Sequence, residues 1–318
     1  MSGVAWDGVS SGKAGEGDTR ENALAAAAQA IADLDLAARR VVVDTAEGFA
    51  TWREWGRGPA IVLLHGGAGS WMHFFRQIPY LAGNYRVVAP DIPGFGDSSE
   101  SRSEAVPEVM ARILATGIER LVGDGAFFLV GFSFGGIIGG YLARLMQPRI
   151  TGYVLVGGVG FEAPTRSVSL SRWRHLGDAA ERRAVHRRNL AALMIADPDR
   201  IDDTAILIQE ANAGNSRHDT RPIAHSMPLT RVLDESDVPL AAIWGARDHL
   251  AAPAFDERRA WLAERDPHAP FKLVPDAGHW VQYEAPDAFN EMLTECLSSF
   301  DGRRRIRRRP LQGGEHGR

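Results

Sequence analysis

The chain has 318 residues, 45% of them hydrophobic and 24% charged, which indicates one large globular α/β domain or one domain with an insertion. The formal charge of the whole chain is −4, and residues 302–318 contain seven arginines, so the rest of the chain is more acidic than the total indicates. An acidic main domain argues against nucleic-acid binding. We find no apolar run near the roughly 20 residues of a membrane helix, no signal-peptide pattern and a single cysteine, Cys296. We therefore expect a cytoplasmic protein that binds neither nucleic acid nor membrane.

Residues 1–38 are predicted to form an extension ahead of the main domain. Residues 1–17 are rich in glycine and serine and are predicted to be disordered. Asp18 and Glu21 have the spacing of a capping box, and the alanine-rich run that follows predicts a helix over residues 22–40. Apolar residues share one face of this helix, so we expect it to dock on the body of the protein or on a partner chain, which allows a homodimer.

Buried strands and helices alternate over residues 39–160 and again over residues 237–301, the two parts of the predicted core. Strands are predicted at 39–45, 49–55, 60–64, 85–90, 126–130, 152–158, 238–244 and 271–274. Helices are predicted at 73–82, 104–123, 137–146, 255–265 and 286–300. This alternation predicts an α/β fold with a doubly wound, mostly parallel sheet, in which ligands bind beyond the carboxyl ends of the strands.

Residues 161–236 interrupt this rhythm, because they are rich in arginine and histidine and contain no strand signal. Helices are predicted near 168–176, 178–196 and 200–213. About 75 residues without a strand between two buried strands predict a helical insertion that forms a cap, and not a plain loop. Residues 302–318 are predicted to be a solvated basic tail.

The most informative stretch is Gly-Phe-Ser-Phe-Gly-Gly at 131–136, between a buried strand and a helix. This is the G-x-S-x-G nucleophile elbow, a turn so tight that it leaves Gly131 and Gly135 no room for a Cβ atom. It holds the hydroxyl of Ser133 clear of the sheet, at the positive end of a helix that favours an oxyanion. A glycine-rich turn with an incidental serine is the alternative interpretation of this motif alone.

A serine hydroxyl needs a base, and the base needs an orienting acid. Asp248 and His279 each follow a predicted strand, and the chain order Ser133, Asp248, His279 is the one described for α/β hydrolases. Asp276 is a second candidate acid, but it is only three residues from His279 and poorly placed to orient the ring. The histidines show no metal-ligand spacing, so we expect no metal and no cofactor.

Four motifs together resemble the α/β-hydrolase superfamily over residues 41–300: HGG at 65–67, GFSFGG at 131–136, WGARD at 244–248 and GHW at 278–280. The resemblance implies that Ser133 attacks a substrate carbonyl, that His279 is the base and that Asp248 orients it. It also implies that the backbone N–H groups of Gly67 and Phe134 form the oxyanion hole. The serine argues against the dehalogenases and epoxide hydrolases of the superfamily, which carry aspartate at the elbow.

The runs at 65–71 and 278–284 look like those of the meta-cleavage-product hydrolases, which cut carbon–carbon bonds in dienoates from aromatic ring fission. Ala68, His73 and Phe134 depart from that pattern, and four cap arginines compete for the role of the one that binds the dienoate carboxylate in that subfamily: Arg187, Arg188, Arg217 and Arg221. The first expectation is therefore a serine hydrolase that cleaves a carboxylic ester of a medium-sized, partly apolar or aromatic small molecule. Carbon–carbon hydrolysis is the alternative, followed by lactonase or amidase activity. The residues predicted to contact the substrate are Gly66, Trp71, His73, Trp173 and Trp280.

Overall fold

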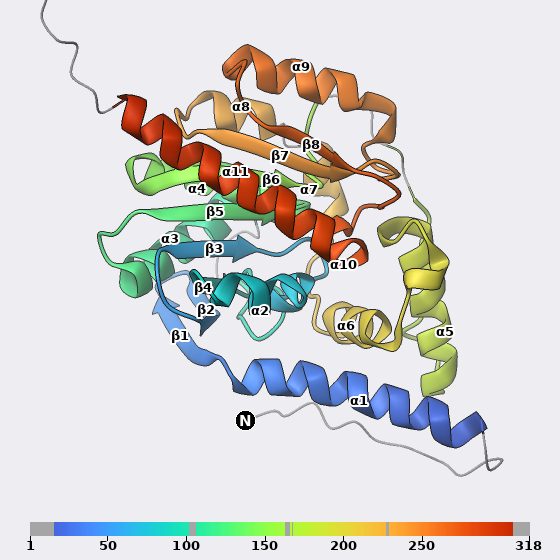
Figure 1. The fold of residues 1–318 in the computed structure, drawn as a ribbon. Coiled ribbons are helices and arrows are strands. Elements are labelled where there is room, and N and C mark those ends of the chain that lie inside the picture. Colours follow the sequence, from blue (N-terminus) through green and yellow to red (C-terminus); the bar gives the residue numbers. More distant parts are fainter. Residues whose placement is uncertain (1–15, 102–105, 163–165, 167, 227–228, 308–318) are drawn as a thin grey trace, which may run out of the picture.

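A computed structural model describes residues 16–101, 106–162, 166, 168–226 and 229–307, built around one eight-stranded sheet (Figure 1). The strand order is β1-β2-β4-β3-β5-β6-β7-β8. Strand β2 pairs antiparallel with both of its neighbours and all other pairs are parallel, which confirms the predicted α/β fold with a mostly parallel sheet. The strands are β1 (Arg39–Thr45), β2 (Gly48–Trp55), β3 (Ala60–Leu64), β4 (Arg86–Pro90), β5 (Phe127–Phe132), β6 (Ile150–Val156), β7 (Leu240–Gly245) and β8 (Phe271–Val274).

Helices cover both faces of the sheet and create two apolar cores. Alternate residues of β3 show this, since Val62 and Leu64 belong to one core and Ile61 and Leu63 to the other. The first face is covered by α3 (Pro107–Val122), α4 (Phe134–Met146), α8 (Leu229–Asp234) and α9 (Phe255–Arg265). The second face is covered by α2 (Gln77–Ala82), α10 (Val281–Glu284) and α11 (Pro286–Arg307). The predicted helix at 73–82 is split into the 3-10 turn η1 (Trp71–Phe74) and α2.

Helix α1 (Glu16–Leu36) docks on the body of this same chain, beside β2 and α6 (Figure 1). The indole Nε1 of Trp55 donates a 2.8 Å hydrogen bond to the carbonyl of Leu34, and Arg53 pairs with Asp35. The helix starts six residues earlier than the predicted start at Asn22, so Asp18 and Glu21 lie inside it. It ends at Leu36, because the chain turns into β1 at Arg39.

The described residues between β6 and β7 form helices and irregular chain, and no strand. They contain α5 (Ala179–Asn189), the π-turn η3 (Leu190–Met194), η4 (Pro198–Arg200), α6 (Asp203–Gly214) and α7 (Arg221–Ser226), in addition to α8. We call residues 161–236 the cap segment; its α5 and α6 lie beyond the carboxyl edge of the sheet (Figure 1). The predicted helix at 168–176 is wrong, because Ser171 bonds through its backbone to the side chain of Asn189 on α5.

Two short 3-10 turns, η2 (Gln147–Arg149) and η5 (Ala252–Ala254), complete the elements of the core. Helix α11 continues past the predicted end at Phe300 to Arg307, so the start of the predicted basic tail is helical. The rest of that tail, residues 308–318, and the first fifteen residues lie outside the described chain. Among the described helices, none combines the length and the hydropathy that a membrane-spanning segment requires.

Candidate active site

Ser133 occupies the turn between β5 and α4, with φ 51° and ψ −114°. This positive φ is strained for a residue with a Cβ atom, and strain of this kind collects at functional sites. The surrounding packing enforces it: a Cβ on Gly131 would lie 2.7 Å from the carbonyl oxygen of Gly135, and one on Gly135 would lie 2.4 Å from that of Leu64. The turn leaves Ser133 half-buried at the N-terminus of α4, where the helix dipole favours negative charge.

The side chains of Ser133, His279 and Asp248 form one hydrogen-bonded chain. The Nε2 atom of His279 lies 2.9 Å from the Oγ atom of Ser133, and its Nδ1 atom lies 2.8 Å from Oδ2 of Asp248. A carboxylate can only accept here, so Nδ1 carries the proton and the lone pair of Nε2 faces the serine hydroxyl. Asp248 is completely buried and also accepts a 2.9 Å hydrogen bond from the amide of Leu250. Asp276, the second candidate acid, is exposed on a turn with φ 56°.

Two buried histidines hold Gly66, the residue before the predicted oxyanion donor Gly67. His65 contacts the Gly66 carbonyl through Nδ1 at 2.7 Å, and its Nε2 accepts the amide of Ile92 at 2.8 Å. His73 accepts the amide of Gly66 on its Nδ1 atom at 3.1 Å. Burial lowers the pKa of both histidines below 6.5, which keeps the His73 acceptor available. The Gly66 amide is thereby used within the protein, and Gly67 supplies the next N–H along the loop.

Gly66 also lies directly against the nucleophile. A Cβ on Gly66 would lie 3.2 Å from the Cβ atom of Ser133 and 2.9 Å from the ring of Phe132. The loop at 65–67 and the first turn of α4, which begins at Phe134, are therefore neighbours of the serine hydroxyl. Gly67 and Phe134 lie in this neighbourhood, and their role as oxyanion donors stays a prediction.

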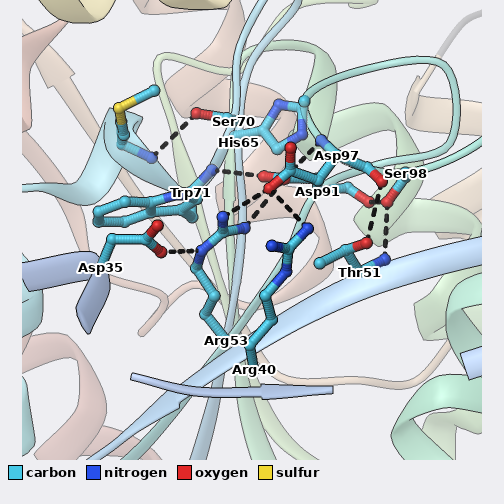
Figure 2. A network of polar contacts seen from close by, with 12 residues as sticks. Asp35, Arg40, Thr51, Arg53, His65, Ser70, Trp71, Asp91, Asp97 and Ser98 are labelled. Atoms are coloured by element: carbon cyan, nitrogen blue, oxygen red, sulfur yellow. Dashed lines mark hydrogen bonds and ion pairs between the residues drawn. The ribbon is translucent and has the colours of Figure 1, made fainter. Parts of the chain in front are cut away.

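A charge network centred on the buried Arg53 and Asp91 lies beneath this loop (Figure 2). Arg53 on β2 donates to Asp91 at 3.1 Å, to Asp97 at 2.6 Å and to Asp35 of α1. Asp91 also accepts the amide of Trp71 at 3.0 Å and that of Asp97 at 3.0 Å. Burial alone would lower the pKa of Arg53, but the three carboxylates outweigh it and raise that pKa. The network connects α1, β2 and the turn after β4 to the end of the loop at 65–71. We call this loop the oxyanion loop, because it carries the predicted oxyanion donor Gly67.

Three residues predicted as substrate contacts are buried and contact other groups of the protein. Trp71 packs against Trp55, with ring centroids 5.4 Å apart, and under the guanidinium of Arg53. Trp280 is fully buried, and its Nε1 atom donates to the carbonyl of His73 at 2.9 Å. His73 itself is 1% exposed and holds Gly66. Sequence adjacency to a motif placed these aromatic rings near the nucleophile, but it does not tell which side of the loop a ring occupies.

Trp173, the predicted contact from the cap segment, packs on another cap residue. Its ring centroid lies 4.9 Å from that of His186 on α5, and the guanidinium of Arg174 lies 4.7 Å from the indole. His186 is fully buried, and neither of its ring nitrogens has a hydrogen-bond partner within the described chain. Burial lowers the pKa of His186, so this pair is an apolar contact inside the cap segment.

Further residues that sequence reasoning missed attach the site to its surroundings. The buried carboxylate of Glu284 accepts the amides of Gly278 at 2.7 Å, Ala196 at 2.9 Å and Asp197 at 2.8 Å. It thus joins the cap segment to the residue before His279. Glu284 is the last residue of the run at 278–284, but only the folded chain shows that its three partners lie together.

The cap loop 215–220 is a second attachment that the sequence did not indicate. The amide of Arg217 donates to the carbonyl of Gly94 at 3.0 Å, and its guanidinium donates to the carbonyls of Gly96 and Ser98. Ser70 of the oxyanion loop donates to Asn212 of α6 at 2.6 Å. No motif or periodicity distinguishes this loop, so its position follows only from the fold.

A buried Asp–His–Ser chain at the carboxyl edge of a mostly parallel sheet is the arrangement of an α/β hydrolase. The model of the α/β-hydrolase fold family matches residues 59–286, and the chain belongs to this family. A 2-hydroxy-6-oxo-6-phenylhexa-2,4-dienoate hydrolase of Burkholderia cepacia is 29% identical over 77% of this chain and 89% of its own length.

A 2-hydroxy-6-oxononadienedioate/2-hydroxy-6-oxononatrienedioate hydrolase of Burkholderia vietnamiensis is 27% identical, over 81% of this chain and 93% of that relative. Among solved structures, an esterase from Rhodococcus sp. aligns with a TM-score of 0.67 at 21% identity, over 83% of this chain and 99% of the other. At that identity the structural likeness supports the fold alone.

Proposed function

We propose that this protein is a serine hydrolase that cleaves a carboxylic ester of a medium-sized, partly apolar or aromatic substrate through an acyl-enzyme on Ser133. The observation that carries the proposal is the hydrogen-bonded chain from Asp248 through His279 to Ser133. The nucleophile on its strained turn, the adjacent N-terminus of α4 and the doubly held Gly66 support it.

In the proposed reaction, the Oγ atom of Ser133 bonds to the carbonyl carbon while its proton passes to Nε2 of His279. The oxyanion that forms accepts hydrogen bonds from the amides of Gly67 and Phe134. The ester C–O bond then breaks, and the leaving alcohol takes the proton from His279. Water then attacks the acyl carbon while its proton passes to His279. The bond between the acyl carbon and Oγ of Ser133 breaks, His279 returns the proton to Oγ, and the acid is released. Asp248 orients the ring and stabilises its cationic form throughout.

Carbon–carbon hydrolysis of a ring-fission dienoate is the second candidate, because relatives at 29% and 27% identity bear such names. A dienoate carries a carboxylate that needs a cationic partner. Of the four competing cap arginines, Arg217 is occupied by backbone carbonyls and Arg221 by Asp219. Arg187 and Arg188 are exposed on α5. This distribution favours an ester as the first substrate class to test.

A panel of esters, lactones, amides and ring-fission dienoates, assayed with the purified chain, tests the proposal. We expect an initial burst of p-nitrophenol from p-nitrophenyl acetate, labelling of Ser133 by a fluorophosphonate and loss of both in Ser133→Ala. The matched control is Ser299→Ala, since the hydroxyl of Ser299 only bonds to the carbonyl of Cys296 on α11. Its kinetic constants should equal those of the parent chain.

Two results would contradict the proposal in different ways. If the fluorophosphonate leaves Ser133 unlabelled, the serine is not an activated nucleophile and every serine-hydrolase mechanism fails. If a dienoate turns over faster than every ester, the nucleophile stands but the bond cleaved is carbon–carbon. If a lactone or an amide turns over fastest, the nucleophile likewise stands, and the protein is a lactonase or an amidase.

A further inference from the structure

Thr220, at the end of the cap loop 215–220, lies directly on Gly67 of the oxyanion loop. A Cβ atom placed on Gly67 would be 2.4 Å from the Oγ1 atom of Thr220, 3.3 Å from its Cβ and 3.4 Å from its Cγ2. A Cβ atom at position 67 would therefore displace the side chain of Thr220. The hydroxyl of Thr220 therefore lies on the same residue that supplies the proposed oxyanion amide.

Backbone conformation does not explain the glycine at position 67. Eight glycines of the described chain adopt a positive φ, and Gly67 is not one of them. An alanine would fit its backbone angles, so the contact with Thr220 is what excludes a larger residue. Within the described part of the chain, the Thr220 hydroxyl forms no hydrogen bond, although its backbone carbonyl accepts the amide of Ala224 at 2.9 Å.

The neighbours of Thr220 fix its position from both sides of the loop. Arg217 bonds to three carbonyls of the turn after β4, as described above. The imidazole of His218 lies on Gly94 and against Phe95, with ring centroids 6.1 Å apart. Phe95 in turn contacts Phe134, the other proposed oxyanion residue, at a centroid distance of 6.0 Å. Loop 215–220, which is anchored by these contacts, thus holds the hydroxyl of Thr220 at the oxyanion loop.

We propose that Thr220 is a catalytic residue, whose hydroxyl donates a third hydrogen bond to the oxyanion beside the amides of Gly67 and Phe134. The inference rests on the proposed acyl transfer at Ser133. It makes the cap segment part of the catalytic machinery, since one oxyanion donor comes from residues outside the sheet and its edge loops. A donor of this kind acts on the tetrahedral intermediate more than on the bound ester.

The test compares Thr220→Val, which removes the hydroxyl and keeps the shape, with Thr220→Ser, which keeps the hydroxyl. Thr116→Val is the matched control, because Thr116 is exposed on α3 and its hydroxyl bonds only to the carbonyl of Arg112. For each variant, kcat and KM are measured with p-nitrophenyl butyrate. The inhibition constant of phenylboronic acid, which forms a tetrahedral adduct with an active-site serine, is measured beside them.

In Thr220→Val we expect kcat to fall by about tenfold or more, with KM within about twofold of the parent. The boronate should bind more weakly by a similar factor, and Thr220→Ser should retain most of both. An unchanged kcat and inhibition constant in Thr220→Val, or a rise in KM alone, would overturn the inference. Fluorophosphonate labelling of Ser133 is followed in every variant: an unlabelled parent chain refutes the proposed function, whereas labelled variants with parental kinetics refute only the role of Thr220.

Discussion

The side chain of Arg258 is buried against the turn that follows Asp248. Its Nη1 atom donates to the carbonyls of Ala251 at 3.0 Å and Ala254 at 2.8 Å. The carbonyl of Asp248 accepts the amides of Ala251 at 3.1 Å and Ala252 at 2.8 Å, so the guanidinium and the acid share one small turn. Burial lowers the pKa of Arg258, and the charge of Asp248 opposes this shift. Arg258 is thus a positioning residue for the acid of the candidate site.

Replacing Arg258 by methionine should impair both stability and turnover. The substitution removes the guanidinium donor from both carbonyls, so that Ala251 keeps only the amide of Ala254 and the Ala254 carbonyl loses this donor. We expect this loss to lower the free energy of unfolding by about 2 kcal/mol. The loosened turn holds Asp248 less well, so we expect kcat to fall by about tenfold. Urea unfolding and steady-state kinetics measure the two effects. The control is Arg259→Met on the same helix, whose exposed guanidinium lies 4.4 Å from the ring of Phe271. Equal kcat values for the two variants would refute the positioning role.

At the scale of elements, three of the contacts between the cap segment and the core end at or beside the candidate site. Arg217 bonds to the turn after β4, Asn212 of α6 bonds to Ser70, and Glu284 bonds to residues 196 and 197. Two of these contacts end on the oxyanion loop or the turn beneath it, and the third ends beside His279. The placement of the cap helices is therefore coupled to the geometry of the candidate site.

The Arg217 contact gives a prediction for the cap loop. In Arg217→Ala the carbonyls of Gly96 and Ser98 lose their donor, so loop 215–220 should open more often and expose its backbone amides. We expect faster hydrogen exchange in this loop and a decrease in kcat/KM of about tenfold. Arg231→Ala is the control, since Arg231 is exposed and pairs with Glu162. Parental exchange in Arg217→Ala would show that the backbone contacts alone hold the loop.

At the scale of the whole molecule, the sequence predicts those strands and helices that have a strong local pattern. The strands at 60–64 and 271–274 and the helix at 255–265 match their predicted limits, because continuous apolar runs and clear ends define them. Ser133, Asp248 and His279 each follow a strand, and they lie together because parallel strands end at one edge of the sheet.

Local patterns do not predict the direction in which a loop side chain points, and they do not predict contacts between distant segments. His73 follows the run at 65–71 and Trp280 ends the motif at 278–280, and both side chains are buried and hydrogen-bonded within the protein. Thr220 and Arg217 lie in a loop without periodicity, and their partners are more than a hundred residues away. Such contacts depend on how the cap helices pack, and only the folded chain contains that information.

Three buried histidines, His65, His73 and His186, make the stability of the whole molecule depend on pH. Burial lowers the pKa of each below its ordinary value of 6.5, so each stays neutral in the folded chain. In the unfolded chain the same residues take up protons as the pH falls through 6.5. The free energy of unfolding is therefore highest above that pH and decreases below it, by up to about 1.4 kcal/mol per pH unit for each histidine.

The variant His73→Asn measures how much one of these histidines contributes to the pH dependence of stability. An asparagine oxygen can still accept the Gly66 amide that the Nδ1 atom accepts, but it does not titrate. Urea unfolding between about pH 5 and pH 7 should show a slope of stability against pH that is smaller than that of the parent, by an amount that grows toward about 1.4 kcal/mol per pH unit at the acidic end. The control Thr116→Val, which removes an exposed hydroxyl that does not titrate, should keep the parental slope. If His73→Asn also keeps the parental slope, His73 takes up a proton in the folded chain as readily as in the unfolded one, and the neutral acceptor assigned to the oxyanion loop is wrong.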